Sequence, residues 1–302
     1  KYHTLGISNK THWVHRTEKG NGFELESNNM FASTPQSLIV YPGVFPEQLN
    51  DSVPYASVMQ TATINRVSSS NSFALINNIR KHRFTFSPTA HANIEHVNIT
   101  SMLDAGKDFG GSMDYTSLNF GLGLRVRYTL RQFHAQVHLP VDVMPTFITD
   151  NNSKSTRTRL YFNPSASFSW RISDNWSGTG NVGWSRTPSS WQTIYGAYVL
   201  RNYRSLMRYE GGIYDTESLS GRLKVDYKHI FAQFFAWMEV SAAKSGSDMT
   251  YGSRINEQGL SEMMMVHQPN SNSNIQVRGN LRKDFDWKKL SMETTATWSH
   301  GN

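Results

Sequence analysis

Two short motifs in the sequence have the spacing of chemical sites. In "HAQVH", His134 and His138 are four residues apart, and on a helix both imidazoles would lie on one face and could share a metal ion. On a β-strand, which rises about 3.3 Å per residue, they would be roughly 13 Å apart and could not. The stretch "GTGNVG", residues 178–183, matches the glycine pattern of dinucleotide loops, which bind pyrophosphate at a helix N-terminus. Whether these residues lie on a helix, a strand or a loop decides whether either motif can bind a metal ion or a nucleotide.

The residues around the two histidines alternate with a period of two. Every even-numbered residue from 118 to 130 is apolar, and from 133 to 139 every odd-numbered residue is apolar. Facing residues of an antiparallel pair share one face of the sheet, so the change of parity predicts a hairpin with Arg131 and Gln132 in its turn. A helical period of 3.6 does not fit this pattern. The histidines therefore lie on a strand, and no metal site is expected.

This hairpin has one apolar and one polar face. In the predicted register Arg127 faces Gln136, and Arg125 faces His138. If the polar face lines a wet lumen, the candidate lumen-facing residues are Arg125, Arg127, His134, Gln136 and His138.

The same alternation recurs along the chain. Parity holds across an odd turn at 173–175, and it flips across "KHIF" and across a charged turn at 284–289. A looser hairpin joins 72–79 to 84–94, with Asn77 as an exception on its apolar face, and a weaker one pairs 4–15 with 23–32. Longer polar stretches separate the hairpins, at 34–57, 95–117, 149–158, 186–218 and 243–272. We therefore predict an up-and-down meander of about twelve strands of roughly 9 to 13 residues, the length that crosses a bilayer.

Tryptophans indicate which medium the apolar face meets. Trp170, Trp176, Trp184 and Trp298 are in phase with the apolar set, as lipid-facing aromatic girdles of membrane barrels are. The opposite face carries small polar residues at 165, 167, 169, 179 and 181, which suit a wet lumen. The sequence thus predicts an all-β, antiparallel, up-and-down transmembrane β-barrel, with "GTGNVG" inside a strand and without a nucleotide. A soluble β-sandwich whose tryptophans fill the core is the alternative.

Two prolines and a run of methionines qualify the strand assignment. Pro88 and Pro164 fall inside predicted strands, where a missing N–H indicates a bulge or a strand end. Met263, Met264 and Met265 fall in a predicted connection, where they could form an adaptable contact surface or pack on neighbouring residues.

Composition excludes several classes of protein. The 302 residues are 38% hydrophobic, and no apolar run is long enough for a transmembrane helix. The chain has no cysteine, which excludes disulfides and cysteine-based metal sites. The formal charge of +7 is dispersed along the chain, so we expect no nucleic-acid partner. Esterase-elbow and zinc-protease motifs are absent from the sequence, so we expect neither an enzyme nor a cofactor.

Three runs carry a resemblance to a known family: "TINRVSSSNSFALINNIRKHRFTFSP", "YTLRQFHAQVHLPV" and "LYFNPSASFSWRISDNWSGTGNVGWSRT". They resemble the barrel of TonB-dependent outer-membrane receptors, particularly the Bacteroidota type with an N-terminal carboxypeptidase-like regulatory domain. The resemblance covers roughly residues 61–298. It implies a barrel of about 22 strands with a plug in its lumen. Plug, coupling box and secretory signal are not recognisable in this sequence, so we expect residues 1–302 to be a β-barrel segment of a larger polypeptide.

The resemblance also implies a function. Such receptors bind a nutrient at extracellular loops and pass it through the barrel lumen, using energy from an inner-membrane complex that contacts an N-terminal region. The expected location is the outer membrane of a Gram-negative bacterium, and the expected partners are membrane lipid, that complex, a small nutrient and a surface lipoprotein. Glycan, peptide, siderophore and cobalamin receptors share this architecture. Two alternatives stay open: an autonomous barrel of about twelve strands acting as porin, adhesin or hydrolase, and a soluble all-β binding module.

The connection at 186–218 is the strongest candidate for ligand or partner contact. It interleaves aromatic and arginine side chains, the residue types that dominate binding hot spots. The alternative is a loop whose aromatic rings pack on one another. The candidate contact residues are Trp191, Tyr195, Tyr198, Arg201, Tyr203 and Arg204.

Overall fold

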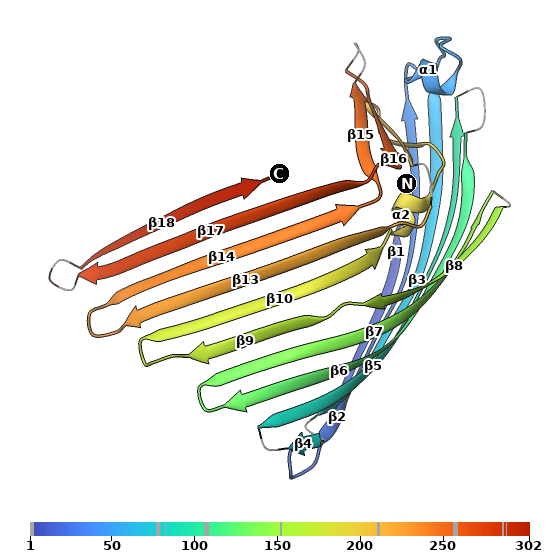
Figure 1. Ribbon diagram of the computed structural model, residues 1–302. Coiled ribbons are helices and arrows are strands. Elements are labelled where there is room, and N and C mark those ends of the chain that lie inside the picture. The colour runs from blue at the N-terminus through green and yellow to red at the C-terminus, as the bar shows by residue number, and fades with distance from the viewer. Residues whose placement is uncertain are drawn as a thin grey trace.

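A computed structural model shows one large, curved antiparallel sheet (Figure 1). It describes residues 3–76, 79–81, 83–105, 109–151, 153–209, 212–255, 259–285, 287 and 289–302. Neighbours in the sheet follow chain order, as predicted for an up-and-down meander. The main path is β1 (Leu5–Arg16), β2 (Gly22–Val40), β3 (Val58–Ile76), β5 (Phe84–Asp104), β6 (Gly111–Leu130), β7 (Phe133–Asp150), β9 (Ser165–Arg171), β10 (Trp176–Pro188), β13 (Asp215–His229), β14 (Phe234–Ser247), β17 (Asn270–Phe285) and β18 (Leu290–Gly301). Two strands lie off this path, β4 (Ile79–Lys81) beside β5 and β8 (Ser153–Phe162) beside β7.

The hairpin predicted from the change of parity is confirmed. Leu130 pairs with Phe133 across a turn formed by Arg131 and Gln132, and Arg131 adopts a left-handed φ of 44°. The odd turn at 173–175 and the flips between β13 and β14 and between β17 and β18 are confirmed as well. Pairing of β1 with β2 confirms the weakest predicted hairpin. The predicted exception at Asn77 lies outside the described residues.

The predicted strand lengths are wrong for the first half of the chain. Strands β2, β3, β5, β6 and β7 contain 18 to 21 residues each, so much of the predicted connections at 34–57, 95–117 and 149–158 is strand. A tilted strand of 20 residues rises roughly 50 Å, about twice the height of the lipid-facing band of a barrel. The far ends of these strands extend beyond such a band, and there the apolar residues change face. Val97, Ile99, Met113 and Tyr115 are buried on the inner face, whereas Asn98 and Asp114 pair on the exposed outer face.

The prolines give a mixed outcome. Pro164 lies between β8 and β9, as expected for a strand end. Pro88 instead lies inside β5, so of the two predicted alternatives the strand end is wrong, while the register shift beside it fits the predicted bulge. The strand tolerates Pro88 because no described residue of β3 or β4 pairs with it. The β3–β5 ladder ends at Ala74 opposite Thr89, and the β4–β5 ladder begins at Ile79 opposite Phe86, in a register shifted by two residues.

One face of the sheet is apolar and open to the surroundings. Leu122 is 70% exposed and Leu160 is 67% exposed on this face. At the end with the short turns, aromatic rings contact one another along the face, with centroids 4.7 to 6.3 Å apart. This aromatic belt comprises Trp13, Phe23, Phe73, Phe84, Tyr128, Phe133, Trp170, Trp176, Tyr227 and Phe234. An open apolar face bordered by aromatic rings is typical of a membrane barrel and does not fit the soluble alternative.

The connections at the other end are structured. A second sheet contains β11 (Val199–Asn202), β12 (Ser205–Tyr209), β16 (Ser261–Val266) and β15 (Thr250–Ile255), in that order. Two short helices, α1 (Pro46–Leu49) and α2 (Trp191–Ile194), lie in the connections that follow β2 and β10. Met263 to Met265 form part of β16, and Met265 is fully buried. Among the described residues, no helix has the length and apolar character to cross a membrane.

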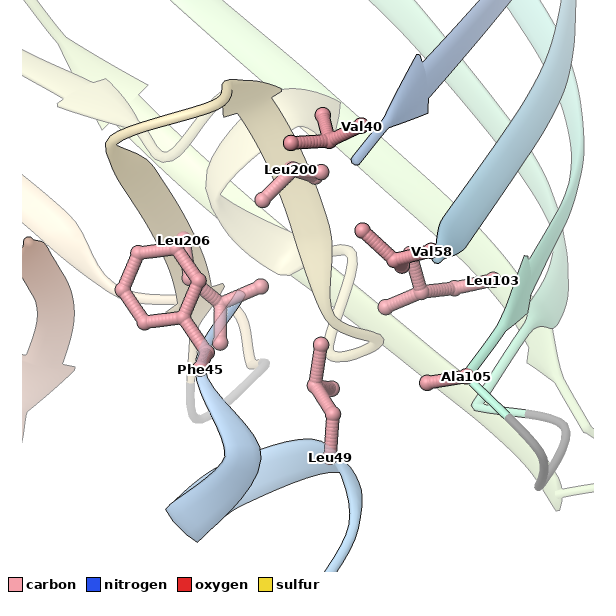
Figure 2. Close-up of a cluster of buried hydrophobic side chains, with 8 residues drawn as sticks. All are labelled: Val40, Phe45, Leu49, Val58, Leu103, Ala105, Leu200 and Leu206. Carbon is pink, nitrogen blue, oxygen red and sulfur yellow. The ribbon is translucent and has the colours of Figure 1, made fainter. Parts of the chain in front are cut away.

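The hydrophobic core lies between these connections and the inner face of the large sheet, the face opposite the apolar one. Figure 2 shows one cluster, in which Val40, Val58 and Leu103 from β2, β3 and β5 meet Leu200 and Leu206 from the second sheet. A second cluster joins Val97, Ile99, Met113, Tyr115 and Ile148 of the wall to Ile194 and Tyr195. The large sheet therefore acts as a wall, onto which the outer connections fold.

Candidate functional site

The connection between β10 and β13 is anchored on the inner wall by Gln60 of β3. Its side-chain amide donates from Nε2 to the Leu200 carbonyl (3.1 Å) and accepts at Oε1 from the Leu200 N–H (2.6 Å). Gln60 is 6% exposed and Leu200 is buried, so water does not replace these bonds. This two-way hydrogen bond fixes β11 against the wall.

Tyr195 forms a second anchor. It is 5% exposed, its hydroxyl donates to the Gly111 carbonyl (3.0 Å), and it also hydrogen-bonds the Ser101 hydroxyl. Burial raises the pKa of Tyr195, so its hydroxyl stays protonated as a donor. This residue was predicted to contact a ligand, and the structure shows that most of its surface contacts the wall.

A cavity of about 270 Å³ remains between the connection and the wall. The connection contributes Trp191, Tyr195 and Arg201 from the predicted contact residues. The wall contributes amides, a hydroxyl and aliphatic groups. The remaining lining residues are Gln36, Gln60, Ala62, Ile64, Ile99, Ser101, Gln192, Val199, Met207 and Tyr209. The arrangement offers one cation, three aromatic rings and several amide groups to a bound molecule.

The other three predicted contact residues do not line this cavity. Tyr198 packs edge-on against Phe109, with ring centroids 5.9 Å apart, and Arg208 lies 5.0 Å above its ring. Tyr203 and Arg204 are exposed next to each other, and the Arg204 guanidinium lies 5.1 Å from the Tyr203 ring. Packing of aromatic side chains on neighbours, the alternative considered for this loop, thus describes Tyr198.

Sequence reasoning missed the wall side of the cavity. Gln36 and Gln60 lie on β2 and β3, in or next to a stretch that was predicted to be a connection. The sequence feature that could have identified them is the odd–even alternation, because Gln60, Ala62 and Ile64 continue the even-numbered positions that face inward on β3. A reading that extended the strands beyond the bilayer would have placed them.

An ion cluster centred on Asp215 fixes the base of the connection. Asp215 is 4% exposed and accepts hydrogen bonds from the Tyr161 hydroxyl (3.0 Å) and from Arg186 Nε (2.8 Å). Arg159 forms an ion pair with the same carboxylate. Beside it, Arg157 Nη1 donates to the Ile213 carbonyl (2.7 Å). The cluster joins β8, β10 and β13. Among the described residues β8 pairs with β7, and β10 pairs with β9 and β13, so these side chains link β8 to β10 where no backbone ladder does.

Asp150, at the outer end of β7, is an acidic group close enough to Tyr195 to add to the rise in the pKa of its hydroxyl. Burial raises the pKa of Asp150 itself, because the partly covered carboxylate loses hydration. Docking of the connection therefore favours the protonated form of this carboxyl.

The predicted lumen-facing residues lie on the inner face of β6 and β7. Arg127 pairs with Gln136, and its Nη2 donates to Gln136 Oε1 (3.3 Å). Arg125 pairs with His138, and Thr129 pairs with His134. The register predicted for these residues is confirmed, and their role in a lumen remains a prediction.

Further along the same face, His91 Nε2 and Asp142 Oδ1 lie 2.8 Å apart. They meet over Gly121, where an alanine methyl would overlap both side chains. Within the described part of the chain, no group of three or more histidine and acidic residues is placed to hold a metal ion.

Comparison with known proteins was made on both sequence and structure. None of the protein-family models matches the sequence, and a comparison with curated proteins finds no match. Solved structures do match, over 99% of this chain. They include the copper transporter OprC (TM-score 0.64, 8% identity, 46% of that chain), the unliganded ferric citrate transporter FecA (0.65, 7%, 42%) and the FpvAI–pyocin S2 complex (0.58, 10%, 40%).

The chain has the fold of an outer-membrane β-barrel wall. This confirms the predicted fold class, and the open apolar face is what the lipid-facing side of a barrel wall requires. The chain spans less than half the length of each of these three structures.

Proposed function

We propose that the protein is an energy-coupled nutrient receptor of the outer membrane, of the TonB-dependent Bacteroidota type. In this proposal residues 1–302 supply part of the wall and the outward connections of its barrel. The observation that carries it is the cavity between the β10–β13 connection and the inner wall. A fold shared with transporters supports the same function.

The cavity suits a small ligand, or the end of a larger one, that has hydrogen-bonding groups. Gln36 and Gln60 offer amides from the wall, Arg201 offers a cation, and Trp191 and Tyr209 offer ring faces. A nutrient would bind here from outside and pass inward when the connection leaves the wall. Energy would come from the inner-membrane complex, and a surface lipoprotein would cover the outer opening.

Uptake by source cells tests this proposal. Labelled siderophores, cobalamin, oligosaccharides and peptides are supplied to cells with the wild-type protein and with the variant Trp191→Ala/Arg201→Ala. We expect one class to be taken up by the wild type, with at least a ten-fold loss in the variant and after addition of a protonophore. The matched control is Phe231→Ala/Arg171→Ala, which changes exposed side chains at the short-turn end. Uptake that persists with the protonophore would contradict the proposal and favour a passive porin.

A further inference from the structure

The net positive charge of the chain is concentrated at the end of the sheet that carries the short turns. Six connections with their adjoining strand ends lie there, at residues 16–22, 77–83, 131–132, 171–176, 228–233 and 282–289. They contain 12 lysines and arginines and 4 acidic residues, a net charge of +8, whereas the whole chain carries +7. Along the sequence this charge is dispersed, but the fold brings it to one edge of the sheet (Figure 1). We call these six connections the basic rim.

Backbone hydrogen bonds between neighbouring turns hold the basic rim together. Each bond runs from an N–H at one turn to a carbonyl of the next, over 2.8 to 3.1 Å. Four of these bonds follow one another along the sheet, from Thr129 to Arg83, Arg171 to Gln132, Lys228 to Asn175 and Asp284 to Gln233. The cations of the rim are therefore carried by turns that are fixed relative to one another.

Several cations of the basic rim are not neutralised by the acidic residues beside them. Asp174 already pairs with Arg171 (3.0 Å), and Asp284 with Arg282 (3.1 Å). Three further cations are exposed, and among the described residues no carboxylate lies within ion-pair distance of them. They are Arg83, Arg131 and Lys228. These three positive charges are available to an external anion.

The same cations lie directly beyond the aromatic belt. Arg83 precedes Phe84, and Lys228 follows Tyr227. Because a strand rises about 3.3 Å per residue, each cation lies within a few ångströms of a belt residue. Aromatic belts lie at the boundary between hydrocarbon and headgroups. The exposed cations are therefore at the level of lipid headgroups.

Apolar side chains protrude from the basic rim as well. Phe231 is 98% exposed and Ile230 is 67% exposed in the turn after β13, and Trp287 is 74% exposed between β17 and β18. Large apolar groups with this exposure indicate contact with another apolar medium. A soluble anion would leave them in water, whereas the headgroup region of a membrane takes up both the apolar groups and the cations.

We propose that the basic rim binds the headgroups of anionic phospholipids in the leaflet on the short-turn side. In an outer-membrane barrel this is the periplasmic leaflet. The guanidinium and ammonium groups would donate charge-assisted hydrogen bonds to headgroup phosphates, and a net negative lipid is favoured over a zwitterionic one because the rim itself is net positive. The apolar turn residues would insert beside these headgroups. This binding requires the wall to lie in a bilayer but does not require nutrient uptake.

Electron spin resonance of spin-labelled lipids tests the proposal. The full-length protein is reconstituted in phosphatidylcholine vesicles that contain labelled phosphatidylglycerol, which is anionic, or labelled phosphatidylcholine, which has no net charge. The motionally restricted signal measures lipid in contact with the protein. We expect phosphatidylglycerol to associate at least about three-fold more strongly at about 0.05 M NaCl, and this preference to fall by at least about half at about 0.5 M NaCl. Equal association at low salt, or a preference that salt leaves unchanged, would overturn the proposal.

Three matched variants locate the preference on the basic rim. Arg83→Gln/Arg131→Gln/Lys228→Gln should lower it by at least about half. A variant that keeps the charges, Arg83→Lys/Arg131→Lys/Lys228→Arg, should retain it.

The third variant, Lys154→Gln/Lys244→Gln/Arg254→Gln, removes three exposed cations from the end with the long connections and should retain the preference as well. An unchanged preference in the first variant, or an equal loss in all three, would contradict binding at the rim. None of these measurements depends on nutrient uptake, so failure of this proposal is distinguishable from failure of the proposed function.

Discussion

Replacement of Gln60 by leucine should release the β10–β13 connection from the wall. The two side chains have similar volume, but leucine can neither donate to the Leu200 carbonyl nor accept from the Leu200 N–H. Both backbone groups of Leu200 would stay buried without a partner as long as the connection remained docked. Each such group costs about 1–3 kcal/mol, so docking should weaken by at least about 2 kcal/mol.

Hydrogen exchange measured by mass spectrometry on peptides from residues 189–209 checks this expectation. A loss of about 2 kcal/mol raises the undocked fraction, and with it the exchange rate of the Leu200 N–H, by roughly thirty-fold. Peptides from the hairpin of β6 and β7 should exchange as in the wild type. The matched control is Gln36→Leu, which also lines the cavity but for which no hydrogen bond to the connection is found among the described residues.

A second variant, Gln60→Glu, separates hydrogen bonding from packing. The protonated carboxyl of this variant has the shape of the glutamine amide and can both donate and accept, whereas the ionised carboxylate cannot donate to the Leu200 carbonyl. Exchange in this variant should approach the wild-type rate at low pH and rise with increasing pH, after correction for intrinsic exchange. Wild-type exchange in the leucine variant, or faster exchange in the Gln36 control as well, would refute the anchoring role of Gln60.

Three further variants test the base of the connection and the inner wall. Asp215→Ala leaves Arg159, whose side chain is 14% exposed, without its counterion. It should lower the free energy of unfolding in detergent by about 3–5 kcal/mol, against about 0–1 kcal/mol for the exposed Glu217→Ala control. Equal losses would contradict an ion cluster centred on a buried carboxylate. Gly121→Ala should lower the free energy of unfolding, measured in the same way, by about 1–3 kcal/mol, because the added methyl overlaps neighbouring side chains. In the control Gly178→Ala the nearest atom to the added methyl is 3.8 Å away, so its free energy of unfolding should lie within about 0.5 kcal/mol of the wild-type value. The pKa of Asp150 is raised when the connection is docked, so protonation of Asp150 stabilises docking below its ordinary pKa of 3.8, and this stabilisation is lost as pH rises through the raised pKa. Asp150→Asn should therefore slow proteolysis of the connection at about pH 7 and make the proteolysis rate depend less on pH. Faster cleavage in this variant would disprove the expectation.

The period-two pattern of the sequence determined the architecture of the wall. Facing residues of an antiparallel hairpin share a face, so the parity of apolar residues fixes both turn and register, as between Leu130 and Phe133. The position of Trp170 and Trp176 in that pattern likewise identified the face that meets lipid. These are local relations along one hairpin, and one sequence contains them in full.

Only the tertiary structure decided where the outer connections lie. In the outer parts of β5 and β6 the apolar residues move to the inner face, where Val97, Ile99, Met113 and Tyr115 pack under the connections. The phase of the alternation therefore inverts within each strand, and these outer parts were mistaken for a loop. The contact of Gln60 with Leu200 joins residues 140 positions apart, and no periodic pattern encodes such a pairing. The residue types of the connection were enough to select Trp191 and Arg201, which line the cavity. They could not show that Tyr195 is buried, because that depends on how the connection folds onto the wall. Local periodicity thus specified the wall, and long-range packing specified the site.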